Sequence, residues 1–172
     1  MIEEKDFTPL IKDYDSLDKK RKKLLDMAED ALVNSYNPYS GFCVGAALLT
    51  DTGEIITGAN YENSSYGLCI CAERAALVRA NAMGYRKFKV IAVIGRIRDY
   101  QNSQKTEPEN IVSPCGPCRQ MLFEANQLSD DFTLEVIMST PGKTQVAISS
   151  ITELLPLGFG PRDIGVDISS FK

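Results

Sequence analysis

The sequence has no histidine among its 172 residues. Histidine is the usual proton carrier near neutral pH, so acid–base chemistry must use another side chain. A long hydrophobic run is also missing, because the longest apolar stretch, around FCVGAALL, is far shorter than the roughly 20 residues that cross a bilayer. These absences argue against a membrane-spanning protein and leave carboxylates and thiols as candidate reactive groups.

An excess of positive charge is absent as well. The chain has 19 lysines and arginines against 23 aspartates and glutamates, a net charge of −4. Nucleic-acid binding rests on a basic surface that neutralises phosphates, so this charge disfavours a polyanionic partner. One basic run, KKRKK at residues 19–23, could form a nucleic-acid or membrane patch, but its amphipathic helical context favours a solvated helix face.

A complete set of disulfides is disfavoured, because the five cysteines are odd in number. The first residues, MIEEKDFTPL, are acidic and lack the apolar stretch of a signal peptide. We therefore expect a reducing, cytoplasmic setting, in which thiols more often bind metal or do chemistry than cross-link the chain.

The length predicts one α/β domain over residues 16–172 after an N-terminal tail, residues 1–15. Two hairpins and a central strand alternate with helices, which predicts a three-layer α/β/α fold with a mixed β-sheet. Residues 96–112 are polar and too long for an ordinary connection, so we interpret them as an insertion. The expected helices run from a Ser16 cap to Tyr36, from Cys71 to Gly84, after Pro114 and over 150–156, and the expected strands cover 42–50, 54–60, 88–95, 132–139 and 144–149.

Three cysteines form a candidate metal site. Cys115 and Cys118 belong to a C-x-x-C motif, PCGPC, in which proline and glycine bend the chain between the sulfurs, and Cys71 lies upstream at the predicted start of another helix. Three thiolates around Zn²⁺ would leave the fourth tetrahedral position to water, which is the pattern of catalytic zinc. Helix N-termini also lower thiol pKa values and so favour anionic sulfur.

Other interpretations of the cysteines remain open. Cys115 and Cys118 could be a thioredoxin-type redox pair. A structural zinc site would need a fourth ligand, for which Cys69 is a candidate, but Cys69 and Cys71 are two apart and would point to opposite sides of an extended segment. Cys43 lies in the first hairpin and is expected in the core.

Charged residues next to these cysteines suggest catalysis. Glu73 follows Cys71 by two residues and could carry protons between a metal-polarised water and a substrate. Its alternative role is that of a helix-start glutamate favoured by the dipole. Arg74 and Arg119 are candidate donors to the sulfurs, since three thiolates on Zn²⁺ leave a net negative charge, although either could be simply exposed.

The motifs CAER at 71–74 and SPCGPCRQ at 113–120 together resemble the cytidine deaminase family, whose signature is H-x-E followed by P-C-x-x-C. Cys71 stands in the place of the histidine, as in the free-nucleoside branch. The segments NPYSGFCVGAALL, GANYENSSYG and TELLPLGFGP resemble the homotetrameric type of this family. The likeness covers roughly residues 30–162 and departs from the family at the insertion.

The resemblance implies roles for matching positions. Glu73 would be the proton shuttle beside one Zn²⁺ per subunit, held by Cys71, Cys115 and Cys118. Asn60 and Glu62 would bind the ribose hydroxyls, although Asn60 could be only a turn former.

Other matching positions would complete the substrate pocket. Phe42 would pack on the base or sugar, although a strand aromatic is often core. The backbone around Ala72 and Ser113 would face the cytosine edge, and Tyr66 and Phe159 would be lent by neighbouring subunits.

The resemblance implies hydrolytic deamination of cytidine and 2′-deoxycytidine to uridine and 2′-deoxyuridine with release of ammonia, a reaction of pyrimidine salvage. It also implies a homotetramer with shared active sites. The nearest alternative is a deaminase of a related cytosine nucleoside such as blasticidin S, against which Asn60, Glu62 and Phe159 argue. A non-catalytic zinc module or thiol-redox protein is the alternative from another class, and polynucleotide deamination is disfavoured by charge and by the missing histidine ligand.

Overall fold

The computed structural model describes residues 10–98, 110–129 and 133–171. Its sheet has six strands in the order β1-β6-β5-β4-β2-β3. β4 and β5 run parallel and the other neighbouring strands run antiparallel, so the sheet is mixed. The strands are β1 (Leu10–Lys12), β2 (Phe42–Thr50), β3 (Ile55–Ala59), β4 (Phe88–Ile97), β5 (Glu135–Ser139) and β6 (Val146–Ser150).

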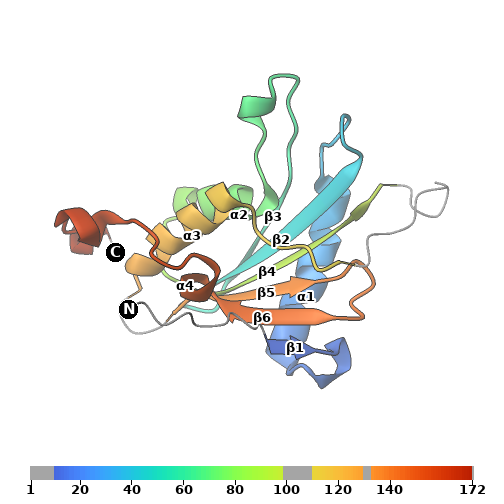
Figure 1. The fold of residues 1–172 in the computed structure, drawn as a ribbon, viewed down its shortest axis with the longest axis horizontal. Helices are drawn as coiled ribbons and strands as arrows, with labels where there is room; N and C mark the ends of the chain where they lie inside the picture. The colour runs from blue at the N-terminus through green and yellow to red at the C-terminus, as the bar shows by residue number, and fades with distance from the viewer. Residues whose placement is uncertain (1–9, 99–109, 130–132, 172) are drawn as a thin grey trace, which may run out of the picture.

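Helices cover both faces of this sheet (Figure 1). α1 (Lys19–Ala31) packs on one face, and α2 (Ala72–Ala82) and α3 (Gly116–Gln127) lie side by side on the other, with the short α4 (Ile151–Leu154) next to α3. The expected three-layer α/β/α fold is therefore confirmed. None of the helices within the described ranges is both long and apolar enough to cross a membrane.

Successive residues of the central strands point to opposite faces and supply two cores. Ala46 and Leu48 of β2 belong to the core under α2 and α3, whereas Ala47 and Leu49 belong to the core under α1. Because both faces are covered, these strands are apolar at nearly every position instead of alternating with polar residues.

Two glycines lie where the backbone of the chain turns. Gly53 has a φ of +105° between β2 and β3, and Gly84 has a φ of +92° just after α2. Residues with a side chain rarely adopt this backbone conformation. The first hairpin and the end of the second helix are both confirmed.

The first helix differs from its prediction at both ends. Its N-cap is Asp18 rather than Ser16, and the Asp18 carboxylate accepts a hydrogen bond of 2.9 Å from the backbone N–H of Arg21. The α-helix ends at Ala31, and a 3-10 turn, residues 32–34, replaces the expected continuation to Tyr36.

Part of the predicted N-terminal tail, residues 1–15, belongs to the sheet. β1 pairs antiparallel with β6, where Ile11 lies opposite Ala147. The Tyr14 hydroxyl donates a hydrogen bond of 2.7 Å to the Asp26 carboxylate of α1. The pairing of β1 at the sheet edge and the Tyr14–Asp26 hydrogen bond attach residues 10–16 to the rest of the fold. Residues 1–9 lie outside the described residues.

The predicted insertion, residues 96–112, begins inside β4. Arg96 and Ile97 still pair with β2, opposite Cys43 and Phe42. Residues 99–109, which hold most of the predicted insertion, lie outside the described residues. Beyond them, the Val112 N–H donates to the Ser139 carbonyl at 3.2 Å, which places the chain beside β5 before α3 begins.

The topology brings two helix N-termini to one edge of the sheet. β3 and β4 both pair antiparallel with β2, so they point the same way. α2 follows β3 and α3 follows β4, and each helix therefore starts at the same edge. In open α/β sheets this edge, outside the carboxyl ends of the strands, is where ligands bind.

Candidate active site and metal centre

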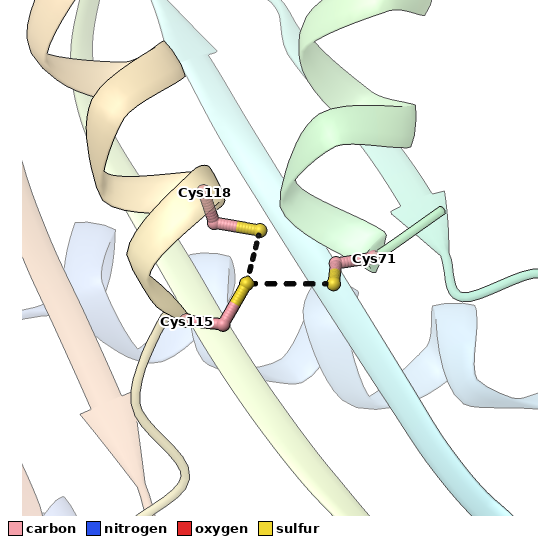
Figure 2. Close-up of side chains that lie close together, drawn as sticks. All are labelled: Cys71, Cys115 and Cys118. Atoms are coloured by element: carbon pink, nitrogen blue, oxygen red, sulfur yellow. Dashed lines mark hydrogen bonds between the residues drawn. The ribbon is translucent and has the colours of Figure 1, made fainter. Parts of the chain in front are cut away.

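Three cysteine sulfurs meet between the first turns of α2 and α3 (Figure 2). Cys71 is the N-cap residue of α2, Cys115 is the N-cap residue of α3, and Cys118 lies one turn further along α3. The Sγ atom of Cys115 is 3.7 Å from that of Cys71 and 3.3 Å from that of Cys118. All three sulfurs lie within 4.8 Å of one another, so the expected convergence is confirmed.

The spacing of the sulfurs fits a tetrahedral zinc ion. Zn–S bonds of about 2.3 Å separate two tetrahedral sulfur ligands by about 3.8 Å, close to the distance between Cys71 and Cys115. Cys118 is buried, whereas Cys115 is exposed, so the cluster opens toward the surface. Among the described residues this is the one group of three or more potential metal-ligating side chains, and three protein ligands leave a coordination position for water.

The surroundings of the sulfurs favour negative charge at Cys71. A hydrogen bond from Cys118, opposed by burial and assisted by Arg74 and Cys115, lowers the pKa of the Cys71 thiol to about 5. The same pairing with Cys71, together with burial, raises the pKa of Cys118. Without a cation, Cys71 is therefore the thiolate of the pair and Cys118 keeps its proton. A metal that bound both sulfurs would displace this proton.

Arg74 supplies positive charge next to the cluster. Its Nη2 donates to the Cys69 carbonyl at 2.7 Å and lies 3.9 Å from the Cys71 sulfur. The Nε atom of Arg74 is buried and has no hydrogen-bond partner in the described part of the chain. This guanidinium fits a negatively charged zinc–thiolate group, as proposed from the sequence.

Glu73 is a buried carboxyl group beside the thiols. It lies in the first turn of α2 and only 4% of its surface is exposed. Burial raises the pKa of Glu73 above its ordinary value, against the opposing effect of hydrogen bonds from its own backbone N–H and from Cys118. A carboxyl group with a raised pKa can take up and release a proton near neutral pH, as a general acid–base group requires.

Arg119 makes contacts other than the predicted one with sulfur. Its Nε donates to the Pro114 carbonyl at 2.8 Å and its Nη1 to the Leu154 carbonyl at 3.0 Å. Arg119 thereby joins the loop before α3 to the end of α4. It fixes the backbone near Cys115.

The Asn60 side chain binds the first residues of β2, and the Glu62 side chain binds the loop before β2. The Asn60 side chain accepts from the Val44 N–H and donates to the Phe42 carbonyl, both at 2.9 Å. Glu62 Oε2 accepts from the N–H groups of Tyr39 and Ser40 at 2.9 and 3.1 Å. The hydrogen bonding around Ser40 holds the pKa of Glu62 below its usual range, so the carboxylate is ionised.

The other predicted substrate contacts differ in exposure. Ala72 is buried at the start of α2, and Ser113 is exposed just before the C-x-x-C motif. Phe42 is partly buried. Tyr66 and Phe159 are 73% and 60% exposed, so each side chain lies at the surface of the protein.

The two remaining cysteines lie apart from the cluster. Cys43 is buried and its sulfur accepts a hydrogen bond of 3.2 Å from Asn37, which agrees with the expected core position. The Cys69 sulfur accepts from the Asn63 N–H at 3.3 Å. Cys69 is not part of the group formed by Cys71, Cys115 and Cys118 in the described structure, which argues against a role as fourth ligand.

Two residues that support the site were missed by the sequence analysis. Gln120 donates to the Phe159 carbonyl at 2.7 Å and so holds the C-terminal segment against α3. Arg98 binds the loop before β2 through Ser35 and Asn37. Gln120 lies in the motif SPCGPCRQ, which could have signalled it, whereas the partners of Arg98 are distant in sequence.

Known proteins resemble this chain over most of its length. Residues 18–129 match the family model described as the cytidine and deoxycytidylate deaminase zinc-binding region. The chain belongs to this deaminase family. Within this family, the convergence of Cys71, Cys115 and Cys118 identifies the zinc-binding region in the structure.

Individual members of the deaminase family cover nearly the same residues. A probable cytidine deaminase of Dictyostelium discoideum is 41% identical over 83% of this chain and 86% of that protein. A cytidine deaminase of Halalkalibacterium halodurans is 40% identical over 84% of this chain and 97% of that protein. The crystal structure of cytidine deaminase from Burkholderia pseudomallei aligns with a TM-score of 0.68 at 42% identity, over 80% of this chain and 97% of that chain.

Proposed function

We propose that this protein is a zinc-dependent cytidine deaminase that converts cytidine and 2′-deoxycytidine to uridine and 2′-deoxyuridine with release of ammonia. The observation that carries the proposal is the placement of a buried carboxyl group, Glu73, beside three convergent thiols. Relatives at about 40% identity bear the name cytidine deaminase, which supports the same substrate class.

The catalytic step assigns a separate task to each part of the site. Cys71, Cys115 and Cys118 would hold zinc, which acts when bound as a Lewis acid that lowers the pKa of water. Glu73 accepts a proton from the attacking water and donates it to N3 of the cytosine ring. The water oxygen bonds to C4, Glu73 carries the second proton to the exocyclic amine, and the C4–N bond breaks to release ammonia.

The sugar would be recognised by Asn60 and Glu62. The side-chain oxygen of Asn60 accepts one hydrogen bond from β2, and the side-chain nitrogen donates one to β2. The oxygen can accept one more hydrogen bond and the nitrogen can donate one more. The backbone N–H groups of Tyr39 and Ser40 both donate to Oε2 of Glu62, and a ribose hydroxyl would donate to Oε1. An ionised carboxylate here would repel a phosphate, which favours nucleosides over nucleotides.

We extend the proposal to the assembly and its setting. A homotetramer in which Tyr66 and Phe159 enter neighbouring pockets accounts for the exposure of both rings. The substrate of each pocket is a small nucleoside rather than a nucleic acid. We assign the protein a cytoplasmic role in pyrimidine salvage, which the proposed substrate and the free thiols support.

The test is to incubate the purified protein with cytidine and follow the loss of the cytosine chromophore. We expect turnover that is abolished by removal of the metal and restored by Zn²⁺. Blasticidin S is assayed in parallel, because a blasticidin-S deaminase of Bacillus cereus is 32% identical over 67% of this chain. Faster turnover of blasticidin S than of cytidine would replace the proposed substrate. A protein that has a reversible Cys115–Cys118 disulfide, and that neither binds added Zn²⁺ nor deaminates cytidine after reduction, would indicate a redox protein.

A further inference from the structure

Arg98 reaches from the end of β4 into the loop before β2. Its Nε donates to Asn37 Oδ1 at 2.8 Å, and its Nη2 donates to the Ser35 carbonyl at 2.6 Å and also to Asn37 Oδ1. Its backbone N–H donates to the Gly41 carbonyl at 2.7 Å. One residue thus contacts both the beginning and the end of the loop, residues 35–41.

The middle of the same loop holds Glu62. The N–H groups of Tyr39 and Ser40 bind the Glu62 carboxylate, and the Glu62 N–H donates to the Tyr36 carbonyl at 2.7 Å. The position of this carboxylate therefore depends on the loop, whose far side is held by Arg98.

Asn37 links the position of the loop, residues 35–41, to the Arg98 guanidinium. Only 2% of Asn37 is exposed, and its other amide atom is used in the bond to the Cys43 sulfur. Removal of the guanidinium would leave the buried Oδ1 atom without the donors that it has in this structure. An unsatisfied buried acceptor is costly, so the loop would shift toward water to recover a partner.

We propose that Arg98 is a positioning residue for nucleoside binding, which sets the place of the Glu62 carboxylate through Asn37 and the loop, residues 35–41. The inference rests on the proposed function, in which Glu62 binds a ribose hydroxyl. In this proposal Arg98 does not contact the substrate, and its removal weakens only the recognition of the sugar.

The test compares cytidine with 2′,3′-dideoxycytidine, which lacks the 2′- and 3′-hydroxyls of the ribose. Arg98→Met keeps much of the aliphatic stem and removes the donors. We expect kcat/KM for cytidine to fall about tenfold, mostly through KM, because a hydrogen bond to a charged group is lost in ground and transition states alike. Turnover of 2′,3′-dideoxycytidine should stay within about twofold of wild type, and Arg98→Lys should recover part of the loss.

Arg86→Met is the matched control. Arg86 also donates to backbone carbonyls, those of Asn81 and Tyr85 at 2.9 and 3.1 Å, but at the opposite end of β4. It should leave both substrates unchanged. Melting temperature and zinc content are measured for every variant, and Arg98→Gln replaces Arg98→Met in the test if the latter does not fold.

The outcomes separate this inference from the function on which it rests. Glu62→Gln should lose cytidine turnover and spare the dideoxynucleoside. One outcome is that Glu62→Gln lowers kcat/KM for cytidine alone while Arg98→Met lowers it for both substrates equally or for neither. In that case the positioning role is wrong and the proposed function stands. If Glu62→Gln is itself unselective, the sugar contact fails, and the role of Arg98 fails with it. Calorimetric binding of uridine against 2′,3′-dideoxyuridine gives the same comparison without turnover.

Discussion

Glu73 combines two properties at the scale of a single residue. It is almost fully buried, and its pKa is raised because burial disfavours the charged form. In a chain without histidine, this carboxyl group is the candidate for proton transfer beside the thiols. Its position two residues after Cys71 was readable from the sequence, but its burial depends on the packing of α2 against α3.

Replacement of Glu73 by glutamine tests this role. Glu73→Gln keeps the size of the side chain and removes its acid–base function, so we expect zinc content to be retained and kcat to fall by about 10²- to 10⁴-fold or more. Glu124→Gln, on the exposed face of α3, is the matched control and should keep full activity. Turnover by Glu73→Gln close to the wild-type rate would refute the shuttle.

The targets of long polar side chains were beyond the reach of sequence reasoning. The arginine after Cys118 was expected to reach sulfur, but it binds the Leu154 carbonyl, which lies 35 residues away along the chain. An arginine can reach many partners, and tertiary packing decides between them. The convergence of Cys71, Cys115 and Cys118 was predictable, because a metal site made of these residues requires their three sulfurs to meet.

At the scale of elements, the active site depends on how closely α2 approaches β3. A Cβ atom on Gly58 would lie 2.5 Å from the Ala72 carbonyl oxygen and 2.4 Å from the Ala76 nitrogen. Both are backbone atoms of α2, which cannot move aside as a flexible side chain would. The glycine therefore sets the position of the helix that carries Cys71 and Glu73.

We expect Gly58→Ala to push α2 away from the sheet. Overpacking of this kind costs about 1–3 kcal/mol, which corresponds to a fall in Tm of about 2–12 °C. Zinc affinity should also fall, because Cys71 moves relative to the cysteines of α3. Gly142→Ala is the control, since the nearest atom, in the Thr144 side chain, is at an ordinary contact distance of 3.8 Å. Equal melting temperatures for the two variants would contradict this account.

The order of helices and strands was largely predictable, whereas their ends were less so. Gly53 and Gly84 mark a turn and a helix end through backbone conformations that sequence patterns signal well. Asp18 and Ser16 are both good N-cap residues, but Ser16 ends a 3-10 turn and Asp18 makes the cap hydrogen bond. The pairing of β1 with β6 was missed, because three exposed or partly exposed residues at a sheet edge leave little pattern to detect.

At the scale of the whole molecule, the protein has large aromatic side chains at its surface. Tyr66 projects from the segment between β3 and α2, and Phe159 lies in the C-terminal segment beside α3. The Tyr66 ring contacts the Tyr39 ring edge-on at 5.8 Å. Exposed aromatic groups of this kind are enriched where proteins associate, which supports the proposed tetramer.

Mixing two defective variants tests whether active sites are shared. Glu73→Gln and Phe159→Ala should each be impaired alone, but the two variants should regain activity when they are co-expressed. In a mixed oligomer, a Phe159→Ala subunit keeps its own Glu73 and can receive Phe159 from a Glu73→Gln subunit. Glu73→Gln mixed with Cys71→Ala is the control, since these two residues serve the same site of one subunit and cannot complement. Absence of any gain with Phe159→Ala would place Phe159 outside the shared pocket.

The three-sulfur cluster also has a consequence for how the protein must be handled. The Cys115 and Cys118 sulfurs are 3.3 Å apart and not bonded, and neither has another covalent partner. A small rotation of either side chain would suffice for air to couple them once the ion has been stripped. Chelated preparations should therefore be kept with a reductant, because a chain oxidised at this pair cannot take zinc back until the bond is reduced.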